Sequence, residues 1–264
     1  LMEVLQTSEG RNSAGISRQT SFVRNLGKIL GHIPARGGSK RLRSKNLRIL
    51  DGKPMLAYAI QCALDCPPLY DTFVNTDSEE IDRLAHSMGV KVYRRPEELG
   101  SDQTTGDDFT ADFIRKTRPD TLVMVSPVCP MVTAGDITNA IEAYQQSDCD
   151  TLITCEATQM QTFCEEKPVN IDTATPLTPS QSNPFVHILN WAVTIWDTAH
   201  FMQSYESRKS GYIGTNRLLY PIAPSHGIKV STENDFQQAE LLLKARQMKN
   251  DYIAPPIYWS GDGS

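Results

Sequence analysis

The sequence predicts an α/β protein in which helices flank a mostly parallel sheet. From residue 28 to residue 155, short apolar runs alternate with segments whose apolar residues recur at helical spacing. This alternation of strands and helices is typical of parallel pairing with helices on both faces of the sheet. The chain of 264 residues is long enough for one large domain of this class.

Each predicted element has its own pattern. The expected strands are apolar runs, namely residues 28–35, 71–77, 90–95, 120–127, 150–155 and 190–196. The expected helices carry an apolar face, namely residues 53–65, 78–89, 105–117 and 135–147. A last helix is expected after Thr232, because Thr232 and Asp235 form a capping pattern ahead of the apolar residues Phe236, Ala239 and Leu243.

A basic loop that contains glycine follows the first predicted strand. The stretch IPARGGSKRLRSKN, residues 33–46, holds two glycines and five cations in a chain whose formal net charge is -5. Glycines let backbone N–H groups approach an anion, and Arg and Lys side chains add phosphate contacts. The spacing matches neither the P-loop nor the dinucleotide-binding GxGxxG pattern. The position after a strand indicates a triphosphate-binding loop, and a solvated basic turn is the alternative.

Polar residues also follow three other predicted strands. Asp77, Arg95 and Ser126 each lie where an apolar run ends. The carboxyl ends of parallel strands meet at one edge of the sheet, where sheets of this kind bind their ligands. The sequence therefore predicts a site at this edge, formed by the basic loop, Asp77, Arg95 and Ser126.

Composition limits the possible partners. No apolar run approaches the ~20 residues of a membrane-spanning helix, so no membrane span is expected. The acidic balance argues against a general nucleic-acid coat, and no nucleic-acid partner is expected. The six cysteines show no metal-finger spacing, which indicates reduced thiols and a cytoplasmic location.

Several segments together resemble the acylneuraminate cytidylyltransferase family, which includes the CMP-sialic acid synthetases. The basic loop resembles the signature loop of that family. Further segments resemble family motifs in the same order across most of residues 28–245, namely GKPMLAYAI, VNTDSEEI, RRPEELGSDQTT, SPVCPMVTAGDI, PSQSNPFVHILNWAV and KVSTENDFQQAELLL. Such an ordered set is far more specific than the loop alone. The chain is identified as similar to a divergent member of this family.

The resemblance implies a fold, an activity and a partner. The implied fold is a Rossmann-like nucleotidyltransferase with a hairpin or loop arm that joins a homodimer. The implied activity is transfer of CMP from CTP to a hydroxyl of an acidic or related sugar, with release of pyrophosphate. The implied parts are a flexible extension (1–26), a nucleotide-binding core (27–156), an arm and acceptor region (157–220), a return to the core with the last helix (221–248), and a tail (249–264).

The resemblance also assigns roles by position. The implied nucleotide-binding residues are Arg36, Gly37, Gly38, Ser39, Lys40, Asn46, Arg95, Thr104 and Gly106. Arg36 and Lys45 are also implied to be catalytic, because phosphoryl transfer depends mainly on positioning and charge stabilisation. Ser126, Gln181 and Asn190 lie at acceptor-binding positions. A structural hydrogen bond within the hairpin is the alternative for Gln181 and Asn190.

The sequence departs from the family pattern on the acceptor side and at the metal site. Ser126 and Val132 stand where the family has Gln and Arg, and the Arg expected shortly before Gln181 is absent. Lys229 and Ser231 replace the Asp-x-Asp pair that holds magnesium in the family. A bound carboxylate and a bound metal would both lose their usual partners.

Two ways to balance the phosphate charge remain. Mg²⁺ is still expected as a cofactor, held by the phosphates together with Asp77, Asp102 or Glu233, since Mg²⁺ often keeps waters and few carboxylates. Alternatively, the ammonium of Lys229 replaces part of the metal's charge, which makes Lys229 a third candidate catalytic residue. Asp77 is the metal ligand that we expect.

Two other functions are compatible with parts of the sequence. A non-catalytic nucleotide-binding subunit, with a regulatory or partner role, would bind CTP without releasing pyrophosphate. A small RNA or DNA contact at the basic loop would show steeply salt-dependent binding. The chain lacks a second basic stretch, and no aromatic residues interleave with the loop's cations, which disfavours a nucleic-acid contact.

Overall fold

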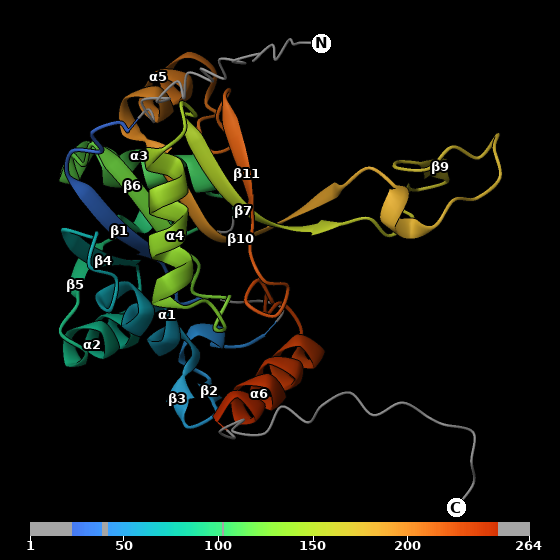
Figure 1. Ribbon diagram of the computed structural model, residues 1–264. Coiled ribbons are helices and arrows are strands. Elements are labelled where there is room, and N and C mark those ends of the chain that lie inside the picture. Colours follow the sequence, from blue (N-terminus) through green and yellow to red (C-terminus); the bar gives the residue numbers. More distant parts are fainter. Residues whose placement is uncertain (1–22, 39–41, 102, 248–264) are drawn as a thin grey trace, which may run out of the picture.

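A seven-stranded sheet organises the protein (Figure 1), in the order β11-β7-β10-β6-β1-β4-β5. The computed structural model describes residues 23–38, 42–101 and 103–247. The strands of the sheet are β1 (Ile29–Pro34), β4 (Asp71–Thr76), β5 (Lys91–Arg94), β6 (Thr121–Val125), β7 (Thr151–Thr158), β10 (Val186–Asp197) and β11 (Arg217–Pro221). Strand β10 is antiparallel to both of its neighbours, whereas the other pairs are parallel. The predicted mostly parallel sheet is therefore confirmed.

Side chains cap the first turn of several helices. The α-helices among the described residues are α1 (Met55–Leu64), α2 (Glu79–Ser87), α3 (Gly106–Thr117), α4 (Ala134–Gln145), α5 (Thr198–Arg208) and α6 (Glu233–Gln247). Thr105 with Asp108, and Thr133 with Asp136, form reciprocal capping boxes at α3 and α4. The cap predicted at α6 is confirmed, since the Asp235 N–H donates to Thr232 Oγ1 and Asp235 Oδ2 accepts from the Thr232 N–H.

The two faces of the sheet are covered by different helices. Buried residues of α1, α2 and α4, such as Ile60, Ile81 and Tyr144, pack on one face. Buried residues of α3 and α5, such as Phe113 and Phe201, pack with Trp196 on the other. Helix α6 instead packs on the segment that follows the basic loop, which contains the short strands β2 (Ile49–Leu50) and β3 (Lys53–Pro54).

An arm projects from the sheet where β7 and β10 leave it together (Figure 1). Thr158 at the end of β7 pairs with Val186 at the start of β10. The tip between them holds the two-stranded ribbon of β8 (Phe163–Cys164) and β9 (Lys167–Pro168) and a 3-10 turn at Ser180–Ser182. The sequence assigned all of residues 157–220 to the arm and acceptor region. The structure places the second half of β10, with α5 and β11, in or against the main sheet.

The described residues include no helix that is long and apolar enough to span a lipid bilayer.

A buried histidine lies in β1, between β6 and β4 of the sheet. His32 in β1 is fully buried, and its ring stacks on Phe113 with centroids 4.4 Å apart. Its Nε2 lies 3.0 Å from Nδ2 of Asn75, and Asn75 Oδ1 already accepts from Arg95. The amide of Asn75 must therefore donate, which requires an unprotonated Nε2 on His32. Burial, together with the charge of Arg95, lowers the pKa of His32 to about 3.

This imidazole should make the protein less stable in mild acid. Between pH 6.5 and about 3 the unfolded chain protonates His32 while the folded chain does not, so the free energy of unfolding falls as the pH falls. A His32→Leu variant has no imidazole to protonate, so it lacks this pH dependence. Between pH 7 and pH 5, we expect the free energy of unfolding, measured with urea, to fall by about 2 kcal/mol more in wild type than in the variant. Equal losses in the two proteins would contradict a neutral buried His32.

Candidate active site

The carboxyl ends of β1, β4 and β5 meet beside the start of the basic loop. The Ala35 N–H donates to the Asn75 carbonyl at 2.9 Å, which guides the loop past the end of β4. The next turn is held by Asp77, whose Oδ1 accepts from the Gly37 N–H at 2.9 Å. A Cβ at Gly37 would lie 2.9 Å from Cβ of Ser78, so the loop passes too close to α2 for a larger residue. Asp77 thus fixes the first turn of the loop.

Arg95 is a buried cation at the same edge. Its Nε donates to Asn75 Oδ1 at 2.9 Å and its Nη2 to the Asn75 carbonyl at 3.1 Å. Its guanidinium lies 4.4 Å from the centre of the Phe109 ring. Burial lowers the pKa of Arg95 to about 10, the charge of Asp77 raises it, and the charge of Arg36 lowers it. Arg95 remains charged at neutral pH. Arg36 lies close enough for its charge to lower the pKa of Arg95.

A hollow of nucleotide size adjoins this cation. It has a volume of about 500 Å³ and is lined by Asp77, Arg95, Glu97, Gly100 and Ser101. Gly100 lies so near Asp77 that an added Cβ would sit 2.7 Å from Oδ2, which restricts this wall to glycine. The buried guanidinium makes the hollow suitable for an anionic ligand.

A second group of cations lies at the carboxyl end of β6. Lys45 Nζ donates to the Val230 carbonyl at 2.9 Å, and the Val230 N–H donates to the Val128 carbonyl at 2.8 Å. Burial raises the pKa of the Cys129 thiol to about 11, whereas a hydrogen bond with Ser126 and the charges of Lys229 and Lys45 lower it. Both ammonium groups therefore lie near the end of β6. The structure brings Lys45, Lys229 and Ser126 together, although they are far apart in the sequence.

The carboxylates around these cations already have partners. Glu233 forms a two-point ion pair with Arg48, at 2.5 and 2.7 Å. Hydrogen bonding to Arg48 lowers the pKa of Glu233, and hydrogen bonding to the Ser231 N–H lowers that of Asp235. The described residues include no group of three or more His, Cys, Asp or Glu side chains able to hold a metal. Among the described residues, Glu233 and Asp235 are therefore engaged by protein donors and are not grouped with a third ligand around a metal position.

The remaining positions on the nucleotide side lie on neighbouring segments. Asn46 is buried, and its Nδ2 donates to the Arg36 carbonyl at 3.1 Å. The Thr104 hydroxyl lies 2.9 Å from that of Ser101, a residue that lines the hollow. Gly106 begins α3, where an added Cβ would lie 2.9 Å from the Tyr212 ring. Gly38 has open space around it. Ser39, Lys40 and Asp102 fall outside the described residues.

Asn190 and Gln181, both predicted on the acceptor side, lie in different parts of the structure. Asn190 is buried beside Ser126 and Cys129: the Ser126 N–H donates to the Ala192 carbonyl, and the Asn190 carbonyl faces Cys129 Sγ at 3.9 Å. Gln181 lies in the projecting arm (Figure 1), where its carbonyl accepts from Gln159 Nε2 at 2.8 Å. Within one chain, Gln181 is not brought together with the other predicted residues.

Sequence reasoning did not select Asn75, which holds Arg95 and His32 at once. The sequence offered little signal, because Asn75 lies in a strand that also contains Asp71, Thr72 and Thr76. Nothing in the local pattern around His32 pointed to Asn75 as its partner, since the two residues lie on different strands.

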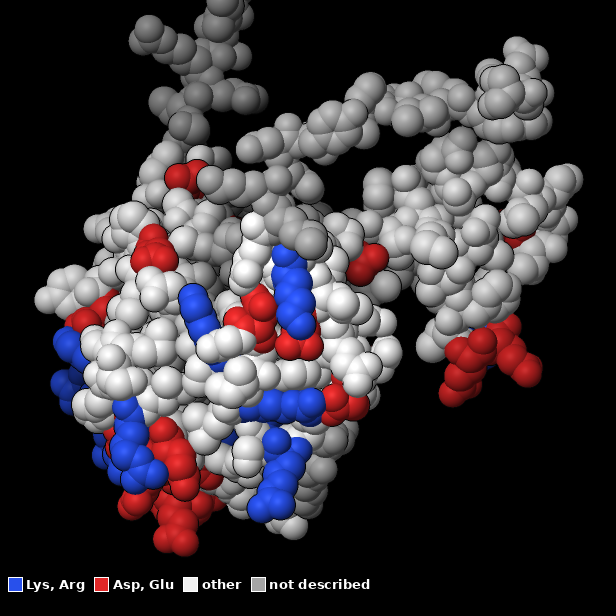
Figure 2. All heavy atoms as spheres, turned by 90° about the horizontal axis from the view of Figure 1, so that it is seen from below, with Lys and Arg blue, Asp and Glu red and all other residues white. Residues whose placement is uncertain are grey.

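The surface around the site carries both signs of charge. Figure 2 shows Lys and Arg side chains beside Asp and Glu side chains on the face seen from below. Arg48 and Glu233 form an ion pair, with Arg48 Nη1 2.5 Å from Glu233 Oε2.

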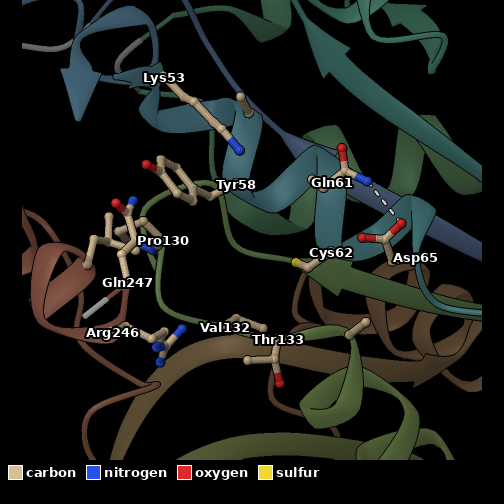
Figure 3. A pocket seen from close by; sticks show the side chains of 13 residues that line it. Lys53, Tyr58, Gln61, Cys62, Asp65, Pro130, Val132, Thr133, Arg246 and Gln247 are labelled. Atoms are coloured by element: carbon tan, nitrogen blue, oxygen red, sulfur yellow. Dashed lines mark hydrogen bonds between the residues drawn. The ribbon is translucent and has the colours of Figure 1, made fainter. Parts of the chain in front are cut away.

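A second hollow, of about 370 Å³, lies between α1, the start of α4 and α6 (Figure 3). Lys53 and Tyr58 enter it from the side of β3 and α1, and Arg246 enters from α6. Val132, which stands where the resemblance has Arg, lines it as a buried apolar residue. No residue predicted for nucleotide or acceptor binding lines this hollow.

Comparisons with known proteins agree with this geometry. A family model described as cytidylyltransferase matches residues 31–221. Over 119 residues the chain is 37% identical to the N-acylneuraminate cytidylyltransferase of an Escherichia coli strain, a match that covers 45% of this chain and 28% of that protein. It is 26% identical to the CMP-N,N'-diacetyllegionaminic acid synthase of Legionella pneumophila, over 83% of this chain and 98% of that one.

Two further comparisons cover most of the chain. Post-translational flagellin modification protein B of Campylobacter coli is 27% identical over 85% of this chain and 98% of its own. A solved CMP:2-keto-3-deoxy-manno-octonic acid synthetase, complexed with CTP, superposes with a TM-score of 0.64 at 18% identity, over 83% of this chain and 99% of that one, which shows a shared fold. Since the family model spans most of the described sheet and the site at its edge, this chain belongs to the cytidylyltransferase family.

Proposed function

We propose that this protein transfers CMP from CTP to a hydroxyl of an acidic sugar and releases pyrophosphate. Membership of the cytidylyltransferase family supports this activity. The observation that carries it is the hollow beside the basic loop, where the buried Arg95 faces Asp77 and lies near Arg36. Relatives whose names specify N-acylneuraminate, diacetyllegionaminic acid and 2-keto-3-deoxy-manno-octonic acid point to acid sugars as the acceptor class.

The proposed reaction is an in-line displacement. The acceptor oxygen attacks the α-phosphorus, the bond from that phosphorus to the β-phosphate oxygen breaks, and the hydroxyl proton passes to solvent. Arg36, Lys45 and Asn46, with Gly37, Gly38, Ser39 and Lys40 of the loop, hold the phosphates. Arg95, Thr104 and Gly106 hold the nucleoside. Ser126 lies on the acceptor side, where Asn190 shapes the backbone, and Gln181 could join this side only from the arm of a second chain. Fixed cations stabilise the charge that spreads over the transferring phosphoryl group.

The proposed nucleotide side comprises residues 27–156 and 221–248. Residues 157–220 comprise the arm and the acceptor side, of which the second half of β10, α5 and β11 belong to the main sheet and its covering layer. The proposed terminal parts, 1–26 and 249–264, lie almost entirely outside the described residues. We place the protein in the cytoplasm, because CTP is an intracellular substrate and all six cysteines are free thiols.

The activity is tested by pyrophosphate release with each of the four common NTPs and three acceptors: N-acetylneuraminic acid, N,N'-diacetyllegionaminic acid and 2-keto-3-deoxy-manno-octonic acid. We expect turnover with CTP and one of these acids, and rates at least 100-fold lower with the other nucleotides. CTP binding by calorimetry without turnover for any acid would contradict the enzyme and favour a non-catalytic nucleotide-binding subunit.

Lys229 is proposed as a catalytic cation that takes over part of the charge of the family's metal. It lies near Lys45 at the end of β6, and Glu233 and Asp235 are engaged by protein donors. Asp77 is the proposed carboxylate for any magnesium ion that arrives with the phosphates, and none of the proposed residue roles depends on that ion. We expect Lys229→Ala to lower kcat roughly 100-fold, because the variant lacks the ammonium that stabilises negative charge on the transferring phosphoryl group.

The matched control for this prediction is Lys229→Arg, which retains the positive charge and should keep most of the rate. Both variants are assayed across a series of Mg²⁺ concentrations with CTP saturating. Full rate in Lys229→Ala would show that the ammonium has no catalytic role.

A homodimer joined through the arm is proposed as the assembly. Large apolar side chains of the arm are half or more exposed, namely Met160, Phe163, Val169, Leu177, Phe185 and Ile188. Several large exposed apolar side chains on one projecting segment favour association. We expect light scattering to give twice the chain mass for wild type and the chain mass for a Phe185→Glu/Ile188→Glu double variant. Leu241→Glu, on the exposed face of α6, is the control, and dissociation in that variant as well would refute an arm-specific interface.

A further inference from the structure

A strained tryptophan lies at the edge of the proposed site. Trp191 has a φ of 58°, in the left-handed region that bulky residues avoid. The other described non-glycine residues with positive φ are polar or charged, namely Ser44, Asp51, Arg118, Glu165 and Lys209. A large aromatic residue in this conformation costs roughly 1–3 kcal/mol and persists only where its surroundings hold it.

The surroundings of Trp191 form a side-chain clamp. Strand β10 bulges away from β7 between Leu189 and Thr194. Asn190 Oδ1 accepts from the Ala192 N–H at 3.1 Å and from the Thr154 hydroxyl at 2.8 Å, and the Val193 N–H donates to that same hydroxyl at 2.9 Å. These buried contacts replace the missing ladder hydrogen bonds. Asn190 therefore positions the backbone of Trp191.

The clamp places the ring at the edge where the acceptor is expected. The carbonyl of Ala192, next in the chain, accepts from the Ser126 N–H at 2.9 Å. The Trp191 ring is partly exposed and lies 5.4 Å from the Tyr212 ring, which contacts Gly106. Tyr212 is itself fixed, because its hydroxyl donates to Met124 Sδ at 3.0 Å and its N–H to Asp107 Oδ1 at 2.9 Å. The Trp191 ring thus continues the aromatic surface of Tyr212 from Gly106, and its backbone lies one residue from the contact with Ser126.

We propose that Trp191 is a specificity-determining residue for the acceptor, and that its ring packs against the C–H face of the acid sugar. This inference rests on the proposed function. A sugar ring offers an apolar face of carbon-bound hydrogens between its hydroxyls, and a rigid aromatic ring is a suitable surface for it. Such a contact orients the acceptor without a charged partner. It suits a site in which Ser126 stands where the resemblance has Gln.

The test separates acceptor binding from nucleotide binding. Trp191→Gly removes the ring and accepts the positive φ without strain, and Trp191→Phe keeps an aromatic face as the matched control. KM and kcat are measured for CTP and for each of the three acids named above. We expect Trp191→Gly to raise the acceptor KM roughly tenfold with an unchanged KM for CTP, and Trp191→Phe to restore most of the affinity.

A binding measurement makes the test independent of turnover. The three acids are titrated onto the CTP-bound protein, and the change in tryptophan emission is compared between wild type and Trp191→Phe. An emission change in wild type that Trp191→Phe lacks supports the contact. An unchanged acceptor KM in Trp191→Gly, an equal rise in the KM for CTP, or no emission change with any acid would overturn the proposal. Turnover of CTP with an unchanged acceptor KM would refute this inference and leave the proposed function intact.

Discussion

The contact between the Arg95 guanidinium and Asn75 holds the site together. Asn75 accepts from Arg95 through its side chain and its carbonyl, and its Nδ2 meets His32. The same carbonyl accepts from the Ala35 N–H at the start of the basic loop. A buried cation is costly unless its N–H groups find acceptors, so this network holds the ends of β1, β4 and β5 in one arrangement. The loop, the hollow and Asp77 are placed by it.

Several charged side chains of the proposed site are engaged by other groups of the protein. Asp77 holds the loop, Glu233 holds Arg48, and Asp235 holds the start of α6. Each of these carboxylates accepts at least one hydrogen bond, Lys45 donates to the Val230 carbonyl, and Lys229 lies near Cys129 after the end of β6. Cations that are in place before the ligand arrives need no reorganisation during the reaction, which is how preorganised charge lowers a barrier. This explains why an acidic chain gathers positive charge on one loop.

Strand β10 connects the acceptor side of the site with the arm. Its second half lies in the middle of the sheet, its bulge lies beside Ser126, and its first half leaves the sheet with β7. One strand therefore links the packing of the core, the wall that carries Trp191 and the arm that carries Gln181. A change at the bulge would shift both the wall that carries Trp191 and the arm, because strand register couples neighbouring side chains.

Local patterns predicted most of the secondary structure. β1, β4 to β7, α1 to α4 and α6 form where apolar periodicity and capping residues predicted them, because both signals act over a few neighbouring residues. α5 and β11 were missed. For α5 the signal was present, as Asp197 caps a segment whose Phe201 and Tyr205 share one face. The run at Arg217–Pro221 is short and follows a stretch rich in turn residues. Its periodicity alone therefore did not distinguish a strand from a loop.

The order of residues along the chain is enough to establish the α/β class, the basic loop after the first strand and the polar residues at the strand ends. Folding, in contrast, establishes that Asn75 holds Arg95, that Arg48 engages Glu233, that Lys229 lies near Lys45, and that Trp191 adopts a left-handed conformation. Those facts depend on strand order, register and a bulge, which bring together residues that no local pattern relates.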